Sequence, residues 1–147
     1  MIYLFDSNII LHYVRQSDLM RNIEQDFDPF GTGNESWLCV VSKGELWSIA
    51  IQNQWGKARR RRLEELMGDF YPADIFSEET IDCDAEIDAF SQNKLPGKPL
   101  GTTARNMGKN DLWIAATAHI LGAKLLTSDA DFDHLDGVYI DLQRIKV

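Results

Sequence analysis

"MIYLFDSNIILHY", residues 1–13, combines the signals of a buried strand and of a helix start. Four apolar residues, 2–5, are followed by Asp6, Ser7 and Asn8, after which the sequence becomes apolar again. A short apolar run that ends at polar residues is typical of a strand buried in the core of a sheet. Asp, Ser and Asn also favour the start of a helix, because their side chains accept backbone N–H bonds. Asp6 therefore either caps a following helix or holds a ligand at the end of the strand.

The same change from a strand-like to a helical pattern recurs along the chain. Strand-like apolar runs occur at residues 2–5, 37–41, 73–76, 124–128 and 138–142. Apolar residues spaced three and four apart predict helices after Asp6, after Ser17, around 46–50, over 57–70, over roughly 80–92 and from Asn110 to Gly122. Strands separated by helices predict an α/β fold with a mainly parallel sheet covered on both faces. We expect one domain, residues 1–147.

The helix "NDLWIAATAHILG", residues 110–122, is apolar on almost every side, which predicts burial by several neighbours. Asn110 is expected to cap its start, and Gly122 to end it in the left-handed conformation. Before this helix, residues 93–109 contain two prolines and three glycines and predict a long loop. Long loops within compact domains are often functional.

Composition excludes several classes of protein. The chain is 44% hydrophobic and 26% charged, as expected for a globular protein. No signal sequence opens it and no stretch is long and apolar enough to span a bilayer, so we expect a cytoplasmic protein without membrane contact. The two cysteines, Cys39 and Cys83, match no disulfide or zinc framework. Two free thiols are typical of a reducing compartment.

The net charge of −8 argues against a nucleic-acid binder that relies on bulk positive charge. The local exception is "GKARRRRLEE", residues 56–65, which contains Lys57 and the arginine run 59–62. On a helix this run surrounds more than half of the circumference, so only part of it can face one ligand. A solvated face paired with Glu64 and Glu65 is compatible with it, and so is a contact with phosphates or a protein partner.

Carboxylates recur at places that the predicted sheet would bring together. Asp6 closes the first strand, and Glu45 is expected in the first turn of the helix after the second strand. Asp111 begins the buried helix, and Asp129 and Asp131 follow the strand at 124–128. In a parallel α/β sheet, the carboxyl ends of the strands and the helix starts beyond them share one edge, where ligands bind.

Each acid also has a simpler explanation. Ser42 and Glu45 match a capping box, Asp111 would favour the helix dipole, and "SDADFD" (128–133) could be a polar turn. Acids gathered at one edge, however, repel one another and raise each other's pKa values unless a cation compensates. Oxygen ligands without histidine or cysteine suit Mg²⁺ or Mn²⁺ rather than zinc.

A divalent cation held by carboxylates suits hydrolysis of phosphodiester bonds. The sequence contains neither a G-x-x-x-x-G-K-[ST] phosphate loop nor a G-x-S-x-G nucleophile elbow. A phosphatase with an aspartyl nucleophile would need a second aspartate where Asn8 stands. The open alternatives are another metal-dependent phosphohydrolase or DNA nuclease, and a binding module that keeps the fold without catalysis.

Four features together resemble the PIN-domain nucleases, in particular the VapC toxins of toxin–antitoxin pairs. They are "FDSNIILHY" (5–13), the acid Glu45, "NDLWIAATA" (110–118) and "LLTSDADFDHL" (125–135). The resemblance extends over essentially the whole chain and is weakest over residues 55–105. It implies a Rossmann-like three-layer sandwich, with a central sheet of four or five strands flanked by helices.

The resemblance also implies a site. The catalytic, metal-holding acids would be Asp6, Glu45, Asp111 and Asp129, with Asp131 as a further candidate ligand. Asn8 would orient the first aspartate, and Thr127 supplies a hydroxyl before the last acid. The stretch before Asp111 is longer and more basic than is usual in the family, so substrate contacts are candidates only: Lys98, Arg105, Lys109 and Arg59.

The activity implied is that of a divalent-metal-dependent endoribonuclease that uses Mg²⁺ or Mn²⁺ and an activated water. It would hydrolyse RNA phosphodiester bonds and leave a 5′-phosphate and a 3′-hydroxyl. The resemblance further implies a homodimer and a cognate VapB-like antitoxin, whose tail fills the acidic groove and relieves growth inhibition.

Overall fold

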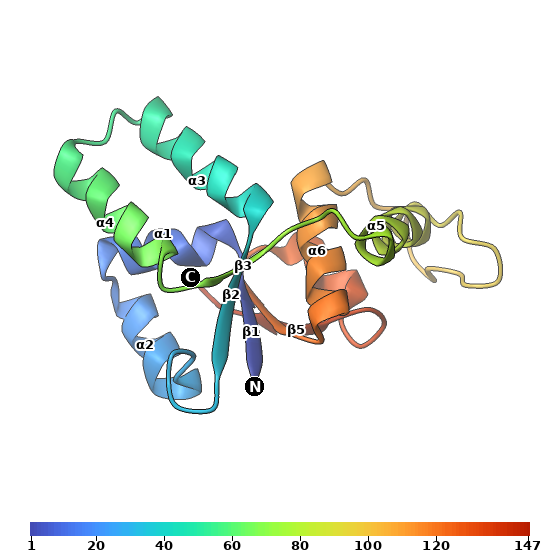
Figure 1. Cartoon of the computed structure of the whole chain (residues 1–147). Coiled ribbons are helices and arrows are strands. Elements are labelled where there is room, and N and C mark those ends of the chain that lie inside the picture. The colour runs from blue at the N-terminus through green and yellow to red at the C-terminus, as the bar shows by residue number, and fades with distance from the viewer.

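The computed structural model describes all residues 1–147, which form a central sheet between two layers of helices (Figure 1). The strands are β1 (Ile2–Phe5), β2 (Glu35–Cys39), β3 (Tyr71–Ala73), β4 (Lys124–Thr127) and β5 (Asp141–Arg144). Every neighbouring pair is parallel, in the order β3-β2-β1-β4-β5. The predicted α/β fold with a parallel sheet of four or five strands is therefore confirmed.

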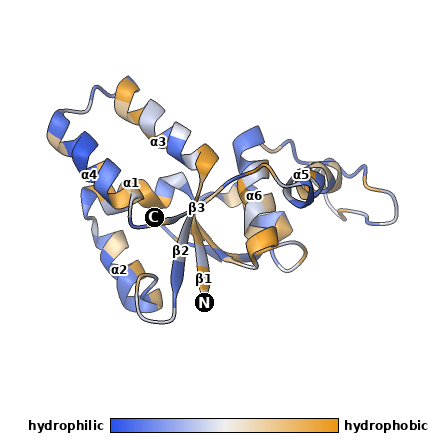
Figure 2. Ribbon diagram, viewed as in Figure 1, coloured by the Kyte–Doolittle hydropathy of each residue, from blue (hydrophilic) through white to orange (hydrophobic).

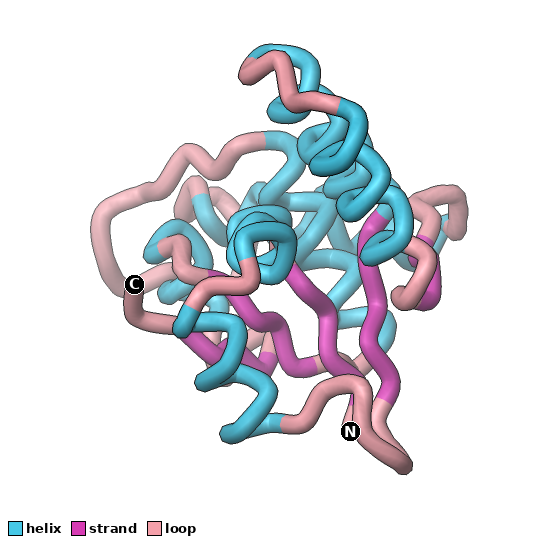
Figure 3. Tube along the Cα trace, turned by 90° about the vertical axis from the view of Figure 1, so that its left-hand side faces the viewer, coloured by secondary structure: helices cyan, strands magenta, loops and turns pink.

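Helices connect the strands and lie on both sides of the sheet (Figure 3). They are α1 (Ser7–Arg15), α2 (Asp18–Phe27), α3 (Val40–Gln52), α4 (Lys57–Met67), α5 (Glu78–Ser91) and α6 (Lys109–Leu121), with a 3₁₀ helix, η1 (Ala130–Leu135). None of them is long and apolar enough to cross a membrane.

The alternation of side chains along the strands divides the core in two. Leu4 and Leu125 belong to a cluster that includes residues of α5, α6 and η1. Their neighbours Phe5 and Leu126 belong to a second cluster, with residues of α1 to α4. Successive strand residues point to opposite faces, so each central strand contributes to both clusters. This explains why β1 is apolar throughout.

Helix α6 is the most deeply enclosed helix. Leu112 and the whole stretch from Ile114 to Ala118 are buried, as its apolar sequence predicts. Gly122, with a φ of 63°, ends the helix in the left-handed conformation, as predicted. The predicted cap at Asn110 is wrong, because α6 already begins at Lys109 and Gly108 is its N-cap residue.

Several predicted strand boundaries are shifted. β2 ends at Cys39 because Val40 and Val41 belong to α3, and β3 spans 71–73 rather than 73–76. β5 begins at Asp141, where pairing with Lys124 of β4 starts, rather than at Val138. A short apolar run predicts that an element exists, whereas the pairing with its neighbour sets where it begins.

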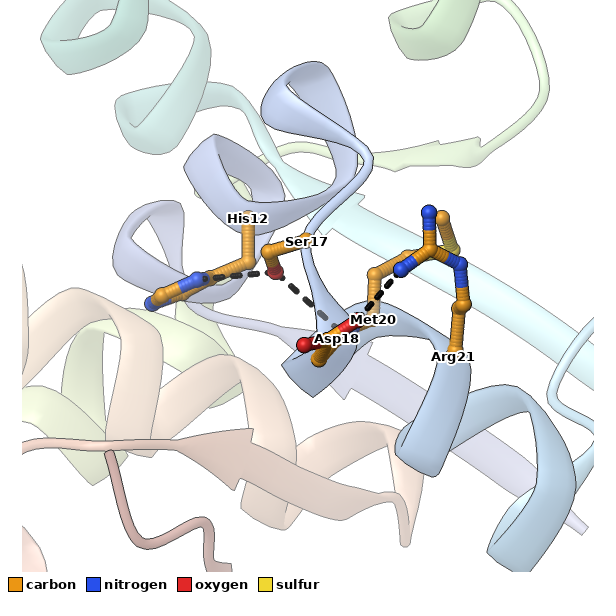
Figure 4. Close-up of polar contacts among 5 residues, drawn as sticks. All are labelled: His12, Ser17, Asp18, Met20 and Arg21. Atoms are coloured by element: carbon orange, nitrogen blue, oxygen red, sulfur yellow. Dashed lines mark hydrogen bonds and ion pairs between the residues drawn. The ribbon is translucent and has the colours of Figure 1, made fainter.

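Ser17 sets the junction between the first two helices, as predicted (Figure 4). Its Oγ accepts a hydrogen bond from the backbone N–H of Met20 at 3.3 Å, which caps α2. The same oxygen lies 3.1 Å from Nδ1 of His12 in α1, and Arg21 pairs with Asp18 on the exposed first turn of α2. His12 thus takes part in a helix junction.

Two helices begin near the carboxyl end of the sheet. Figure 1 shows α3 extending away from the sheet beyond β2, with α4 returning beside it, whereas α6 runs back alongside the sheet towards β4. We call α3, residues 53–56 and α4 the α3–α4 hairpin. The predicted acids follow the strands or belong to the helices at this end of the sheet.

Candidate metal centre

The carboxyl ends of the two central strands carry the first members of the site. β1 and β4 are hydrogen-bonded neighbours, with Phe5 opposite Leu126. Asp6 follows β1 directly, and Asp129 lies two residues beyond β4. Asp111 stands in the first turn of α6, and Glu45 is part of α3. The topology therefore gathers acids that are up to 123 residues apart in sequence (Asp6 to Asp129).

Asp6 is buried and firmly held, with only 3% of its surface exposed. Its Oδ1 accepts the backbone N–H of Ser7 at 2.8 Å, which makes it the N-cap of α1. Its Oδ2 accepts hydrogen bonds from the Thr127 hydroxyl at 2.7 Å and from the Asn8 amide at 3.2 Å. Burial raises the pKa of Asp6, and the charge of Asp129 adds to the rise, whereas the bonds from Thr127 and Ser7 lower it.

Thr127 links the first acid to the last. Its Oγ1 donates to Asp6 and accepts the backbone N–H of Asp129 at 3.0 Å. The side-chain Oδ1 of Asn8 accepts a hydrogen bond from the backbone N–H of Ser128 at 3.3 Å. In turn, Oδ1 of Asp129 accepts the N–H of Asp131 at 2.9 Å at the start of η1. These bonds define one geometry for the loop after β4 relative to the end of β1.

The capping box that Ser42 and Glu45 could have formed is absent. Helix α3 begins at Val40, so Glu45 is its sixth residue rather than part of its first turn, and Ser42 is a buried helical residue. Glu45 instead lies close enough to Asp6 for the two charges to interact. Burial raises the pKa of Glu45, the charge of Asp6 raises it further, and the amide of Asn110 lowers it. Its Oε1 is buried without a hydrogen-bond partner.

Among the clustered acids, Asp111 has a strongly raised pKa. One carboxylate oxygen each from Asp111, Asp129 and Asp131 lie within 4.8 Å of one another. Burial, and then the charges of Asp6, Asp129, Glu45 and Asp131, raise the pKa of Asp111 to about 7. A carboxyl group with this pKa is half protonated near neutral pH unless a cation approaches it.

This donor set fits a hard divalent cation. It offers only carboxylate oxygens, one of which, Oε1 of Glu45, is buried without a partner. Such an oxygen costs free energy unless a cation or a donor reaches it. Mg²⁺ and Mn²⁺ prefer oxygen ligands, and a bound cation would remove the repulsion among the acids. The residues of the cluster are therefore suited to hold such an ion.

The basic residues that are candidates for substrate contact are spread over three parts of the chain. Lys109 is exposed at the start of α6, two residues before Asp111. Arg105 is exposed in the loop that precedes it. Lys98 lies over the ring of Tyr139, with its Nζ 4.0 Å from the ring centre. Arg59 lies over Trp55 on the α3–α4 hairpin, at 5.3 Å.

A groove beside the acids was not anticipated from the sequence. It has a volume of about 540 Å³, and its lining includes Glu45, Ser48, Gln52 and Asn110. Val41, Glu45, Ser48 and Gln52 are spaced four, three and four residues apart, which places them on one face of α3. This spacing is visible in the sequence, but only the structure shows that this face of α3 lines a groove.

Comparisons with known proteins identify the family and the fold. The PIN domain family matches residues 3–138. The fold is similar to VapBC2 from Rickettsia felis, solved bound to a promoter DNA fragment, with 20% identity, 98% of both chains covered and a TM-score of 0.77. VapBC-1 from nontypeable Haemophilus influenzae matches with 20% identity, 98% of both chains and a TM-score of 0.74. VapBC-5 from Mycobacterium tuberculosis matches with 19% identity, 99% of this chain, 98% of that one and a TM-score of 0.61.

A comparison with curated protein sequences finds no significant match. The family match covers most of the chain, and the solved structures at low identity share its fold. With a parallel sheet and acids clustered beyond its carboxyl end, among them Asp111, Asp129 and Asp131, the chain belongs to the PIN-domain family.

Proposed function

We propose that this protein is a divalent-metal-dependent endoribonuclease and the toxin of a toxin–antitoxin pair. The observation that carries the proposal is the acidic cluster, in which burial and mutual repulsion raise the pKa of Asp111 to about 7. Strongly perturbed carboxyl groups concentrate at functional sites, and a bound cation would offset the repulsion among these acids. Membership of the PIN-domain family supports hydrolysis of phosphodiester bonds as the use of that cation.

In this proposal Asp6, Glu45 and Asp111 hold the principal Mg²⁺ or Mn²⁺. Asp129 and Asp131 contribute through water or hold a second ion. Such a cation, when bound, activates water and stabilises charge on the phosphate. The hydrogen bonds from Thr127 and Asn8 keep Asp6 in one orientation, so that its position does not change as substrate enters.

The charge of the chain shapes how RNA would approach. With a net charge of −8, the protein repels RNA except where cations gather. We assign the first phosphate contact to Lys109, which is exposed near Asp111, and further contacts to Arg105, Lys98 and Arg59. The acidic cluster itself attracts phosphate only when its metal is bound.

The toxin role rests on the fold shared with the VapBC structures over nearly the full length of both chains. We propose a cognate antitoxin that inhibits by covering the acidic cluster, a homodimeric toxin and a cytoplasmic location. The antitoxin supplies the control that a free ribonuclease would need inside a cell.

The test is RNA cleavage by the purified protein with Mg²⁺ or Mn²⁺, followed by sequencing of new 5′-phosphate ends. We expect Asp111→Asn to reduce the cleavage rate roughly 100-fold or more, the usual loss when a charge-stabilising group is removed from a catalytic site. The matched control is Asp69→Asn, which removes an exposed aspartate just before β3, at the opposite edge of the sheet.

A wild-type protein that binds Mg²⁺ but cleaves no RNA would refute the nuclease and favour a binding module. Growth of cells that express the protein also distinguishes a nuclease from a binding module. A nuclease toxin arrests growth, whereas its folded Asp111→Asn variant does not.

A further inference from the structure

The groove beside the acidic cluster follows one face of α3. Glu45 lies at its acidic end, and Ser48 and Gln52 extend it along the helix, opposite Asn110 of α6. Gln52 follows Glu45 by seven residues, which at 1.5 Å per residue is a length of about 10 Å. The groove thus begins at Glu45, a candidate metal ligand, and continues along α3, the helix whose course Figure 1 shows.

The lining of this groove differs from the rest of the surface in its charge. Glu45 is its one charged residue, although 26% of the chain is charged and the net charge is −8. Beyond Glu45 the polar groups are a hydroxyl and two amides, from Ser48, Gln52 and Asn110. Amides both donate and accept hydrogen bonds, which is how proteins read the edges of bases.

Gly44 keeps part of the groove free of side-chain atoms. It is exposed within α3 and lines the groove, and a Cβ built on it would contact nothing within 4 Å. Glycine inside a helix is less stable than alanine, and here no neighbouring side chain requires its small size. The missing side chain keeps space open outside the protein, in the groove.

We propose that this groove is the specificity subsite that holds the unpaired RNA bases next to the scissile phosphate. Gln52 and Ser48 contact base edges, Asn110 contacts the nucleotide nearest the acids, and Gly44 leaves room for the strand. The inference rests on the proposed ribonuclease function. Beyond Glu45 the lining holds amides and a hydroxyl, which match base edges, and it lacks the further acids that a basic peptide would need.

The interaction between Gln52 and Ser48 shows how the two side chains work together. The Gln52 amide donates to the Ser48 hydroxyl at 2.8 Å, which holds the side chain along the groove. One amide proton and the carbonyl oxygen of Gln52 stay available for a base. Both residues are exposed, so a base reaches them without rearrangement of the fold.

The experiment measures cleavage of short single-stranded RNAs that differ only in the nucleotides beside the cut. We expect Gln52→Ala to reduce the ratio of kcat/KM between the best and the altered sequences roughly tenfold, the discrimination that one amide–base pair supplies. The matched control is Ile51→Ala, since Ile51 is 63% exposed on the same helix and does not line the groove.

A second variant, Gly44→Leu, fills the groove without weakening the fold. Leucine is a better helix former than glycine, so the unfolding midpoint should rise while KM for RNA increases and Mg²⁺ binding is unchanged. A loss of stability cannot then explain the loss of RNA binding.

The outcomes separate this inference from the proposed function. If the wild-type protein cleaves RNA and both variants keep its sequence preference and KM, the subsite is refuted while the nuclease stands. If Gly44→Leu leaves cleavage unchanged and weakens only inhibition by the antitoxin, the groove belongs to a peptide and the inference is wrong. If the wild-type protein cleaves no RNA, both proposals fail.

Discussion

The carboxylate of Asp6 was predicted either to cap a helix or to hold a ligand. Its Oδ1 caps α1 through the N–H of Ser7, and its Oδ2 is held by Thr127 and Asn8. Capping and site formation are therefore not alternatives at this residue. Because the cap determines where the side chain lies, the start of α1 also positions a candidate metal ligand.

Thr127→Val tests the positioning of Asp6 with little change in side-chain shape. We expect Mg²⁺ affinity to fall roughly 10- to 100-fold, as for other losses of a group that orients a metal ligand. Stability should fall by about 1–3 kcal/mol, because the N–H of Asp129 and one oxygen of Asp6 lose a partner. Isothermal titration calorimetry and urea unfolding measure the two effects.

Thr117→Val is the control for this substitution, since the Thr117 hydroxyl is also buried and donates within α6 to the Trp113 carbonyl. It should lower stability without changing Mg²⁺ affinity. Equal Mg²⁺ affinity in wild type and Thr127→Val would contradict the positioning role.

Asp111 predicts how the metal-free protein responds to pH. Its pKa is about 7 in the folded state against an ordinary 3.8, so folding favours the protonated form. The contribution of this group to stability is complete below about pH 4 and is lost as the pH rises towards 7. The free energy of unfolding of metal-free wild type, measured relative to Asp111→Asn, should therefore fall between about pH 4 and pH 7.

With saturating Mg²⁺, wild type should be more stable than Asp111→Asn at the higher pH, because binding stabilises the folded wild type by mass action. Urea unfolding with EDTA and with Mg²⁺ provides the comparison. A difference between wild type and variant that does not depend on pH would show that Asp111 is not under the repulsion described here.

At the scale of elements, α4 shows how one run of like charges is divided between fold and surface. Figure 2 shows α4 as largely hydrophilic. Arg62 nonetheless donates to the carbonyl of Val14 near the end of α1 at 3.0 Å, and Arg60 donates to the carbonyl of Trp55. Arg61 pairs with Glu65 on the exposed side, and Arg59 covers Trp55. The interpretation as a solvated face paired with glutamate holds for Arg61, whereas Arg60 and Arg62 bond to the fold itself, and the phosphate or partner contact stays a prediction.

Arg62→Ala should lower the free energy of unfolding by about 1–2 kcal/mol, because a carbonyl at the end of α1 loses a charged donor. Arg61→Ala should change it by less than about 0.5 kcal/mol, since its ion pair is exposed and screened. Urea denaturation of the two variants provides the measurement. Equal losses would mean that the bond to Val14 contributes nothing measurable.

The whole molecule combines a negative net charge with a substrate that is also negative. RNA binding then depends on a few contacts rather than on a general positive surface. If Lys98, Arg105, Lys109 and Arg59 are those contacts, the slope of log K against log salt concentration should be no steeper than about −3, from −0.7 per phosphate on a single strand.

Binding of the non-cleaving Asp111→Asn protein to a single-stranded RNA at several salt concentrations tests this prediction. Adding Lys109→Ala should make the slope shallower by about 0.7, whereas Lys146→Ala at the C-terminal end should not change it. A much steeper slope would point to a broad electrostatic surface that the charge distribution does not predict.

The sequence alone determined the alternation of strands and helices, and with it the parallel sheet. The reason is that burial on both faces of a central strand requires an apolar run such as 2–5, and an amphipathic or apolar helix must cover it. It also predicted that acids would lie at one edge, because the carboxyl ends of parallel strands share it, and Asp111, Asp129 and Asp131 do lie within 4.8 Å of one another. Local signals identified Ser17 and Gly122 as helix boundaries, since each acts within one turn.

Only the tertiary structure decided the rest. Where β2 ends and α3 begins depends on pairing with β1 and β3, and this register placed Glu45 towards Asp6 instead of in a capping box. The raised pKa of Asp111 comes from burial and from charges on three other segments, the chain after β1, helix α3 and the loop after β4, which no local pattern contains. The groove along α3 exists because α6 packs across from it, so Gly44, Ser48 and Gln52 gained a shared surface only when the chain folded.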